Sequence, residues 1–233
     1  MKKFTFFSAF ILLFISVSAQ TPSYVAAPGG GEKSVMIYIR DLTGKPMYGF
    51  NEISGVEGTP FLDKDEQIGT VRFKDGRMTK DVHLKFNMLN SKLYFVRDGV
   101  NLEFVDTVKD FYLQSVENNT LGAVYRSDFP PIDKNTSSTF YELLVDGKLS
   151  LLKHRYKVIT EYREYSASTK KRYDERTQLY ASLPGNRIVK IRKDRKFLMD
   201  AMPEYADKIK TITDKLKLKN DESLISLFEE LNK

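Results

Sequence analysis

The two histidines of the chain are its side chains best suited to acid–base or metal chemistry near neutral pH. His83 lies on the polar side of an alternating run, whereas His154 is in phase with apolar and aromatic residues. A catalytic dyad or a metal pair would need both rings beside a carboxylate, and no spacing in the sequence indicates that. We expect a solvated His83 and a partly buried, hydrogen-bonded His154. Three residues that share one strand face are candidate ligand-facing residues: His154, Tyr156 and Tyr162.

An acidic cluster is the only candidate metal site that the sequence offers. Asp63, Asp65 and Glu66 place three carboxylates within four residues, and Ca²⁺ takes oxygen ligands of this kind. The glycine and the ligand spacing of an EF-hand loop are missing, so an exposed acidic loop is the preferred interpretation. We expect no cofactor.

A basic cluster is a candidate anion-binding site. Six cations lie close together in the sequence and could bind phosphate groups. Basic clusters on protein surfaces are common, so a solvated junction between a strand and a helix is the preferred interpretation. The cluster consists of Arg187, Lys190, Arg192, Lys193, Arg195 and Lys196.

The remaining composition excludes several classes of chemistry. The chain has no cysteine, which excludes disulfides, thiol nucleophiles, iron–sulfur clusters and cysteine-ligated zinc. No local motif of a serine hydrolase, a zinc protease or a phosphate-binding loop occurs. A hydrolase that uses two carboxylates from distant strands needs no local motif and stays open among the 31 acidic residues. We expect a protein that is not an enzyme.

The N-terminal residues have the pattern of a secretory signal peptide. Lys2 and Lys3 precede an apolar run that is too short to span a bilayer and that ends on small residues before Gln20. We predict a signal peptide at residues 1–19, a flexible leader at 20–32, and no transmembrane segment after cleavage. The protein is then periplasmic or secreted, and nucleic acid is not expected as a partner.

Alternating apolar residues predict a β domain over residues 33–191. Asp–Gly pairs at Asp75-Gly76, Asp98-Gly99 and Asp146-Gly147 separate such runs, and this pair is typical of hairpin turns because glycine accepts a positive φ. Successive hairpins favour an antiparallel meander, folded as a sandwich or a half-open barrel. We expect a strand at Ser34–Arg40 and an irregular loop with at most one short strand at Gly44–Asp63.

Helical spacing of apolar residues follows over residues 192–233. Pro203 suits the first position of a helix, and Asn220 or Asp221 suits the cap of the last one. About three short amphipathic helices are predicted, which makes the chain an α+β protein.

This layout resembles a family of exported proteins of unknown function in Bacteroidetes. The resemblance rests on residues 69–76 (GTVRFKDG), 82–87 (VHLKFN) and 140–148 (FYELLVDGK), and on the closing helices. It implies an exported protein and assigns no catalytic residue. We expect a non-catalytic binding or structural role in the envelope, with a lipid, a glycan or another envelope protein as partner. A periplasmic carrier of an apolar ligand and a hydrolase of envelope polymers are the alternatives.

Overall fold

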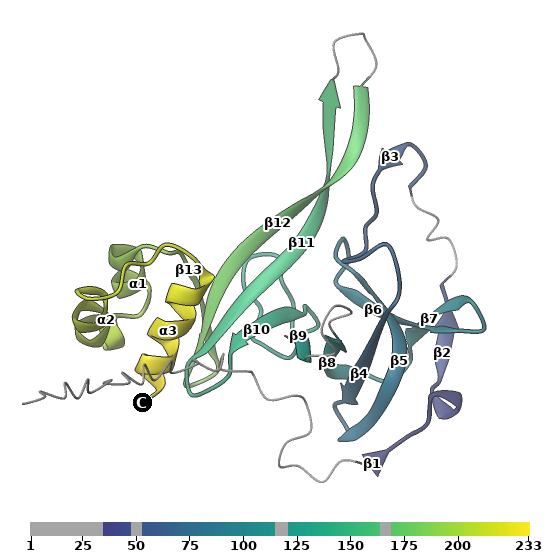
Figure 1. Ribbon diagram of the computed structural model, residues 1–233, viewed down its shortest axis with the longest axis horizontal. Coiled ribbons are helices and arrows are strands. Elements are labelled where there is room, and N and C mark those ends of the chain that lie inside the picture. The colour runs from purple at the N-terminus through teal and green to yellow at the C-terminus, as the bar shows by residue number, and fades with distance from the viewer. Residues whose placement is uncertain (1–34, 48–52, 115–120, 164–168) are drawn as a thin grey trace, which may run out of the picture.

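The computed structural model describes residues 35–47, 53–114, 121–163 and 169–233 (Figure 1). Within these ranges the chain forms one sheet of 13 strands followed by three α-helices. The predicted signal peptide (1–19) and leader (20–32) lie outside the described residues.

The strands occupy most of the chain up to Ile191. In order they are β1 (Val35–Met36), β2 (Gly44–Pro46), β3 (Val56–Glu57), β4 (Gln67–Phe73), β5 (Arg77–Asn87), β6 (Lys92–Arg97), β7 (Val100–Phe104), β8 (Val108–Gln114), β9 (Leu121–Arg126), β10 (Tyr141–Val145), β11 (Ser150–Arg163), β12 (Thr169–Leu183) and β13 (Arg187–Ile191). The helices are α1 (Arg195–Ala201), α2 (Ala206–Thr213) and α3 (Asp221–Asn232), with short 3₁₀ turns at Ile39–Asp41 and Pro203–Tyr205.

The sheet is an antiparallel meander with one rearrangement. The order is β13-β12-β11-β10-β9-β8-β4-β5-β6-β7-β2, so β8 pairs with β4 instead of with its predecessor β7. Two short strands join in parallel, β1 beside β5 and β3 beside β12. The predicted antiparallel sheet and three C-terminal helices are confirmed, and the sheet is not closed.

Two local predictions are wrong. Ser34 lies outside the described residues, and within the rest of the expected strand Ser34–Arg40 only Val35–Met36 is a strand, because the chain turns into a 3₁₀ helix at Ile39. The segment Gly44–Asp63 contains two short strands, β2 and β3, and not one at most. Both strands pair with distant elements, β7 and β12, which a local pattern does not reveal.

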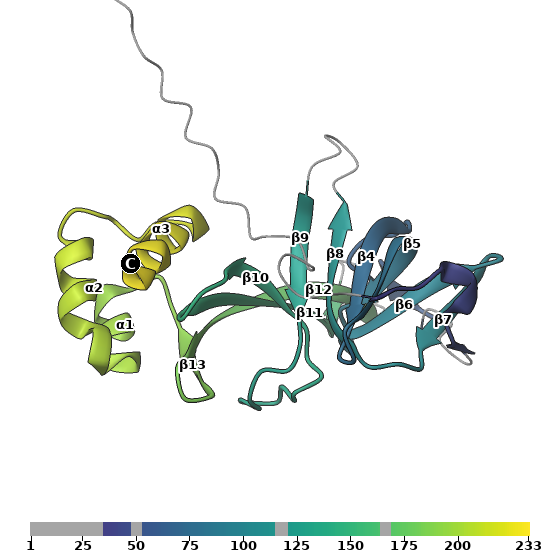
Figure 2. The ribbon, with the colours of Figure 1, turned by 90° about the horizontal axis from the view of Figure 1, so that it is seen from below.

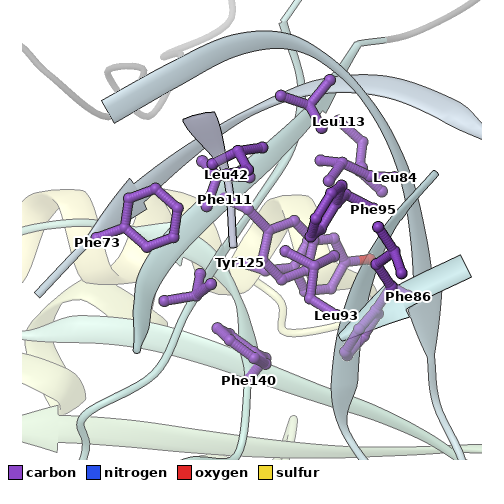
Figure 3. Packing of buried hydrophobic residues seen from close by; sticks show 14 of the residues in the cluster. Leu42, Phe73, Leu84, Phe86, Leu93, Phe95, Phe111, Leu113, Tyr125 and Phe140 are labelled. Carbon is purple, nitrogen blue, oxygen red and sulfur yellow. The ribbon is translucent and has the colours of Figure 1, made fainter. Parts of the chain in front are cut away.

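The larger apolar core lies between the strands of the N-terminal half. Figure 3 shows aromatic rings at its centre, where Phe111 stacks on Tyr125 with 4.9 Å between ring centroids. Phe140 and Phe86 pack against Phe111 at 5.1 and 5.3 Å. Since large rings bury the most apolar area per residue, this cluster provides much of the stability of a protein without disulfides.

A second core forms where the helices cover the other end of the sheet. Figure 2 shows α1, α2 and α3 gathered over β10–β13, away from β4–β7. Leu224, Leu227 and Phe228 of α3 are fully buried there. The predicted cap is confirmed, since the Asn220 side chain accepts a hydrogen bond from the Ser223 amide.

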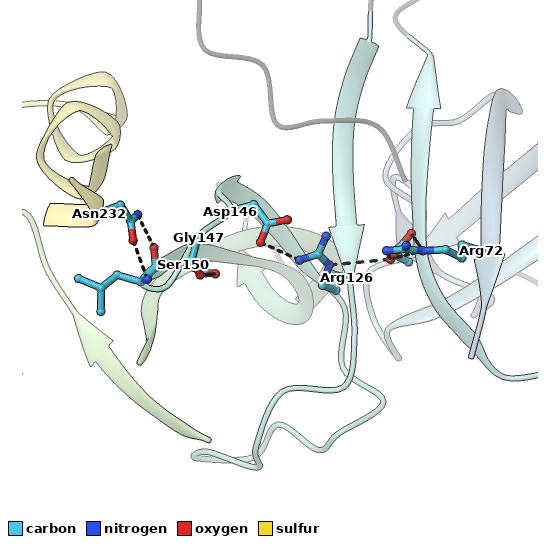
Figure 4. Close-up of polar contacts among 8 residues, drawn as sticks. Arg72, Arg126, Asp146, Gly147, Ser150 and Asn232 are labelled. Atoms are coloured by element: carbon cyan, nitrogen blue, oxygen red, sulfur yellow. Dashed lines mark hydrogen bonds and ion pairs between the residues drawn. The ribbon is translucent and has the colours of Figure 1, made fainter. Parts of the chain in front are cut away.

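The last helical turn is fastened to the turn between β10 and β11. The Asn232 side chain accepts from the Leu149 amide at 2.8 Å and donates to the Leu149 carbonyl at 2.9 Å (Figure 4). A Cβ at Gly147 would lie 2.8 Å from the Asn232 amide nitrogen, so the close approach needs glycine there. Asn232 therefore pairs with the turn as a neighbouring strand would.

A chain of charges crosses the middle of the sheet. Arg72 on β4, Asp110 on β8 and Arg126 on β9 are cross-strand neighbours (Figure 4). The Asp110 carboxylate is fully buried and accepts from Arg72 Nε at 3.0 and 3.2 Å, with Arg126 Nε at 3.8 Å. Arg126 Nη1 in turn donates to Asp146 at 2.9 Å. These charged contacts link β4, β8 and β9 to the turn that holds Asn232.

The β11–β12 hairpin projects well beyond the rest of the sheet (Figure 1). The two strands pair without interruption from Ser150↔Ser182 to Arg163↔Thr169. Cross-strand partners share a face of the sheet, so one face carries the even-numbered residues and the other carries the odd-numbered ones. The odd face, with Leu151 and Ala181, packs on the helices, and the even face, with His154, does not.

Candidate functional site

A groove of about 900 Å³ lies on the even face of the hairpin. Its floor is formed by β11 and β12, and its walls by the turn at residues 88–91 and by the loop between β9 and β10. The Lys157 amide donates to the Met88 carbonyl at 3.0 Å, which fixes the turn against the hairpin. The groove therefore lies where the projecting hairpin meets the main sheet.

His154 is the buried polar group on this floor. His154 is 8% exposed, and its ring stacks on the Tyr156 ring with 4.9 Å between centroids and 20° between the ring planes. Burial lowers the pKa of His154 to about 4, so the imidazole is neutral at physiological pH. The Asn135 amide nitrogen lies 3.3 Å from Nδ1. With Asn135 as the donor, the proton resides on Nε2, which forms no hydrogen bond to any described residue.

Asn135 also organises the two tyrosines beside His154. Its amide nitrogen donates to Tyr141 Oη at 3.0 Å and lies 3.4 Å from Tyr180 Oη. The Tyr180 hydroxyl donates to Asp133 at 3.0 Å, and the Lys190 ammonium lies 3.6 Å from the same carboxylate oxygen. Burial and this bond raise the pKa of Tyr180, so its hydroxyl keeps its proton. The network fixes each side chain of the floor in one orientation.

A tight turn in the loop between β9 and β10 positions Asp133 and Asn135. Ile132 and Asn135 pair as an isolated bridge, with backbone hydrogen bonds of 2.9 and 3.2 Å. Asp133 adopts φ 54° in this turn, a conformation that Asp tolerates better than most residues. The turn places one carboxylate and one amide over the aromatic floor.

We predict that His154 makes stability depend on pH between about 4 and 6.5. Burial lowers the folded-state pKa to about 4 from an ordinary value of 6.5, so in this window the unfolded chain binds more protons. The free energy of unfolding therefore rises with pH across this window, by about 3 kcal/mol in total. Urea unfolding at pH 4, 5, 6 and 7 measures the slope, which His154→Gln should reduce. His83→Gln, at an exposed ring, is the matched control; equal slopes for both variants and the wild type would refute the assignment.

The other two candidate ligand-facing residues lie on the same face as His154. Tyr156 lines the groove. Tyr162 lies farther out on the hairpin, where its hydroxyl donates to Glu57 at 2.6 Å and the Arg172 guanidinium lies 5.1 Å above its ring. The period of the strand was sufficient to place all three residues on one face.

The candidate anion-binding residues are not brought together as one site. Lys193 pairs with Asp221 at 2.7 Å, and Arg195 with Asp214 at 2.8 Å. Arg187 pairs with Glu204, Arg192 lies 4.9 Å above the Phe197 ring, and Lys196 lies on α1. Lys190 alone of the six lines the groove. Arg187 and Lys193 join the end of the sheet to the helical segment, and Arg195 joins α1 to the end of α2.

The candidate calcium ligands do not converge either. Asp63 accepts from the Asp65 amide at 3.2 Å, and Glu66 pairs with His83 at 3.0 Å. Over residues 35–47, 53–114, 121–163 and 169–233, no group of three His, Asp or Glu side chains is arranged to hold a metal ion. The acidic segment is an ordinary exposed loop with local hydrogen bonds.

Sequence patterns did not identify the residues that complete the groove. Asp133 and Asn135 lie in the loop between β9 and β10, and Tyr141 lies on β10. No periodic pattern in the sequence places that loop over β11. The one available signal was the run Pro130-Pro131-Ile132-Asp133, whose prolines and aspartate are typical of a turn.

Comparison of the chain with protein-family models, curated proteins and solved structures finds no match. In the part of the chain that the structure describes, no helix has the length and apolar character needed to cross a bilayer.

Proposed function

We propose that the protein is an exported envelope protein that binds a glycan, without catalysis, in the groove over His154. The observation that carries the proposal is the floor of the groove, where a stacked ring pair lies among side chains held by the Asn135 network. Sugars are bound by an aromatic face together with a few fixed polar groups, and this floor supplies both. The signal-peptide pattern and the family resemblance support export to the periplasm or beyond.

The polar floor favours a glycan over an apolar ligand. An acyl chain would cover the Nε2–H of His154 and the Lys190 ammonium without offering either of them a hydrogen bond. Burying a donor without a partner costs about 1–3 kcal/mol. A sugar has hydroxyl groups that can satisfy them.

The groove lacks the acid pair of a glycoside hydrolase. Among the described residues that line it, Asp133 is the one carboxylate, and it already accepts from Tyr180. Burial raises the pKa of a second acid, Glu142, but Glu142 pairs with Lys153 across the strands and so lies on the helix side of the sheet. A binding role therefore accounts for the groove better than hydrolysis does.

Tyr156→Ala tests the proposal. Loss of the partly exposed ring should weaken binding of a soluble oligosaccharide about 5- to 10-fold, the usual contribution of one aromatic contact. Isothermal titration calorimetry of residues 20–233 with short neutral and acidic oligosaccharides measures the affinity. Tyr38→Ala removes an exposed tyrosine that lines no part of the groove and serves as the control. Binding of lipid vesicles, or sugar affinities that Tyr156→Ala leaves unchanged, would contradict the proposal.

A further inference from the structure

The even face of the hairpin continues the groove outward. Beyond the floor, the cross-strand pairs on this face are Tyr156↔Arg176, Val158↔Asp174, Thr160↔Arg172 and Tyr162↔Lys170. Residues 154 to 162 span about 27 Å at about 3.4 Å per residue. The face follows the twist of the hairpin and offers an extended track, longer than one small ligand needs.

The chemistry of this track is aromatic and cationic. Its outer four pairs hold three cations and one carboxylate, and Glu57 of β3, the cross-strand neighbour of Arg172, adds a second carboxylate. Tyr156 and Tyr162 lie about 20 Å apart along β11. Arg172 is held in place by Asp174 at 2.7 Å and by the Tyr162 ring. The groove adds Lys134, Lys157 and Lys190 against the single carboxylate of Asp133. Both parts therefore favour a ligand with negative charge.

The donors of the groove agree with this charge. With Asn135 as the donor to Nδ1, His154 carries an N–H at Nε2, and the Lys190 ammonium, which also lines the groove, carries further hydrogens. Lys157 is half-buried and already donates to the Thr59 carbonyl at 2.9 Å, so it supports the wall. Acceptor oxygens with negative charge satisfy such donors best.

We propose that the ligand is a linear acidic polysaccharide that lies in the His154 groove and continues along the even face of the hairpin, with its rings on Tyr156 and Tyr162 and its carboxylates near Arg176 and Arg172. The inference rests on the proposed function and adds the charge and the length of the ligand.

The test is the dependence of affinity on chain length. Oligomers of a uronic acid with two to eight units, and carboxyl-reduced oligomers of equal length, are titrated against residues 20–233. Affinity for the acidic series should rise at least tenfold from two to six units, whereas the neutral series should stay flat. A flat acidic series would overturn the inference, and so would tighter binding to vesicles of an anionic phospholipid.

A pair of matched double variants separates the track from general electrostatics. Arg172→Gln/Arg176→Gln removes two cations from the even face. In this variant the affinity should no longer rise with oligomer length, while the two-unit oligomer still binds. Arg163→Gln/Lys171→Gln removes two cations from the odd face and should keep the gain. Equal losses in both variants would overturn the inference. If Tyr156→Ala leaves binding of every oligomer unchanged, the proposed function itself fails, which is a separate result. Circular dichroism confirms that the variants fold.

Discussion

Replacing Asp110 by alanine is expected to destabilise the protein by about 3–5 kcal/mol. The carboxylate is fully buried between Arg72 and Arg126, and Arg72 itself is almost completely buried. Without Asp110, the Arg72 guanidinium keeps its charge but loses the carboxylate that offsets its desolvation. An uncompensated buried charge is among the most damaging defects that a single substitution can produce.

Denaturant unfolding of Asp110→Ala measures this cost. Glu103→Ala removes the carboxylate of the exposed pair with Lys92 and should cost less than about 1 kcal/mol. A double variant, Arg72→Met/Asp110→Leu, should recover much of the loss, because apolar residues of similar volume replace buried ion pairs at little cost. Equal effects of Asp110→Ala and Glu103→Ala would show that the buried chain of charges is unimportant for stability.

Phe111→Ala is expected to cost about 3–5 kcal/mol through the cavity that it leaves. Phe111 is fully buried at the centre of the larger core and contacts the rings of Tyr125, Phe140 and Phe86. These rings belong to three other strand regions, so the void cannot close by moving one element. Each lost ring contact adds to the transfer free energy of the side chain.

Thermal unfolding compares Phe111→Ala with two variants. Phe111→Leu keeps much of the volume and should cost clearly less. Val100→Ala truncates an apolar side chain that is 48% exposed and should stay within about 0.5 kcal/mol of the wild type. A Phe111→Ala effect no larger than that of Val100→Ala would show that the aromatic cluster is loosely packed.

The regular elements of the fold were predictable from local patterns. The three Asp–Gly pairs lie at turns between paired strands, and the helical stripes lie on α1, α2 and α3. The cap at Asn220 was predicted from residue type and position. Such features depend on neighbours in the chain, which a single sequence displays.

Features that join distant segments were not predictable in this way. The pairing of β8 with β4 and the parallel pairs of β1 and β3 depend on which edges remain free when the sheet assembles. Nothing in the local pattern around Arg72 indicates that it is the buried partner of Asp110, 38 residues away. A local pattern distinguishes the two faces of a strand and does not show what covers them.

Some residues of the candidate site were predictable from the sequence and others were not. Periodicity placed His154, Tyr156 and Tyr162 on one face, which the register of β11 and β12 agrees with. The loop that brings Asp133 and Asn135 over His154 has no period, so the network around the ring had no sequence signal. Clustering in sequence also proved a poor guide to clustering in space for the basic residues, most of which pair with separate carboxylates.

The hydrogen bonds between the Asn232 side chain and the Leu149 backbone join segments that are synthesised far apart in time. Strands β10 and β11 leave the ribosome, or a translocation pore, 83 residues before the side chain that fastens them. Until then their helix-facing side is exposed, and exposed strands of this kind are prone to aggregation. A chaperone that holds the chain extended until residue 232 has emerged would therefore raise the folding yield more than one that acts only on the N-terminal strands.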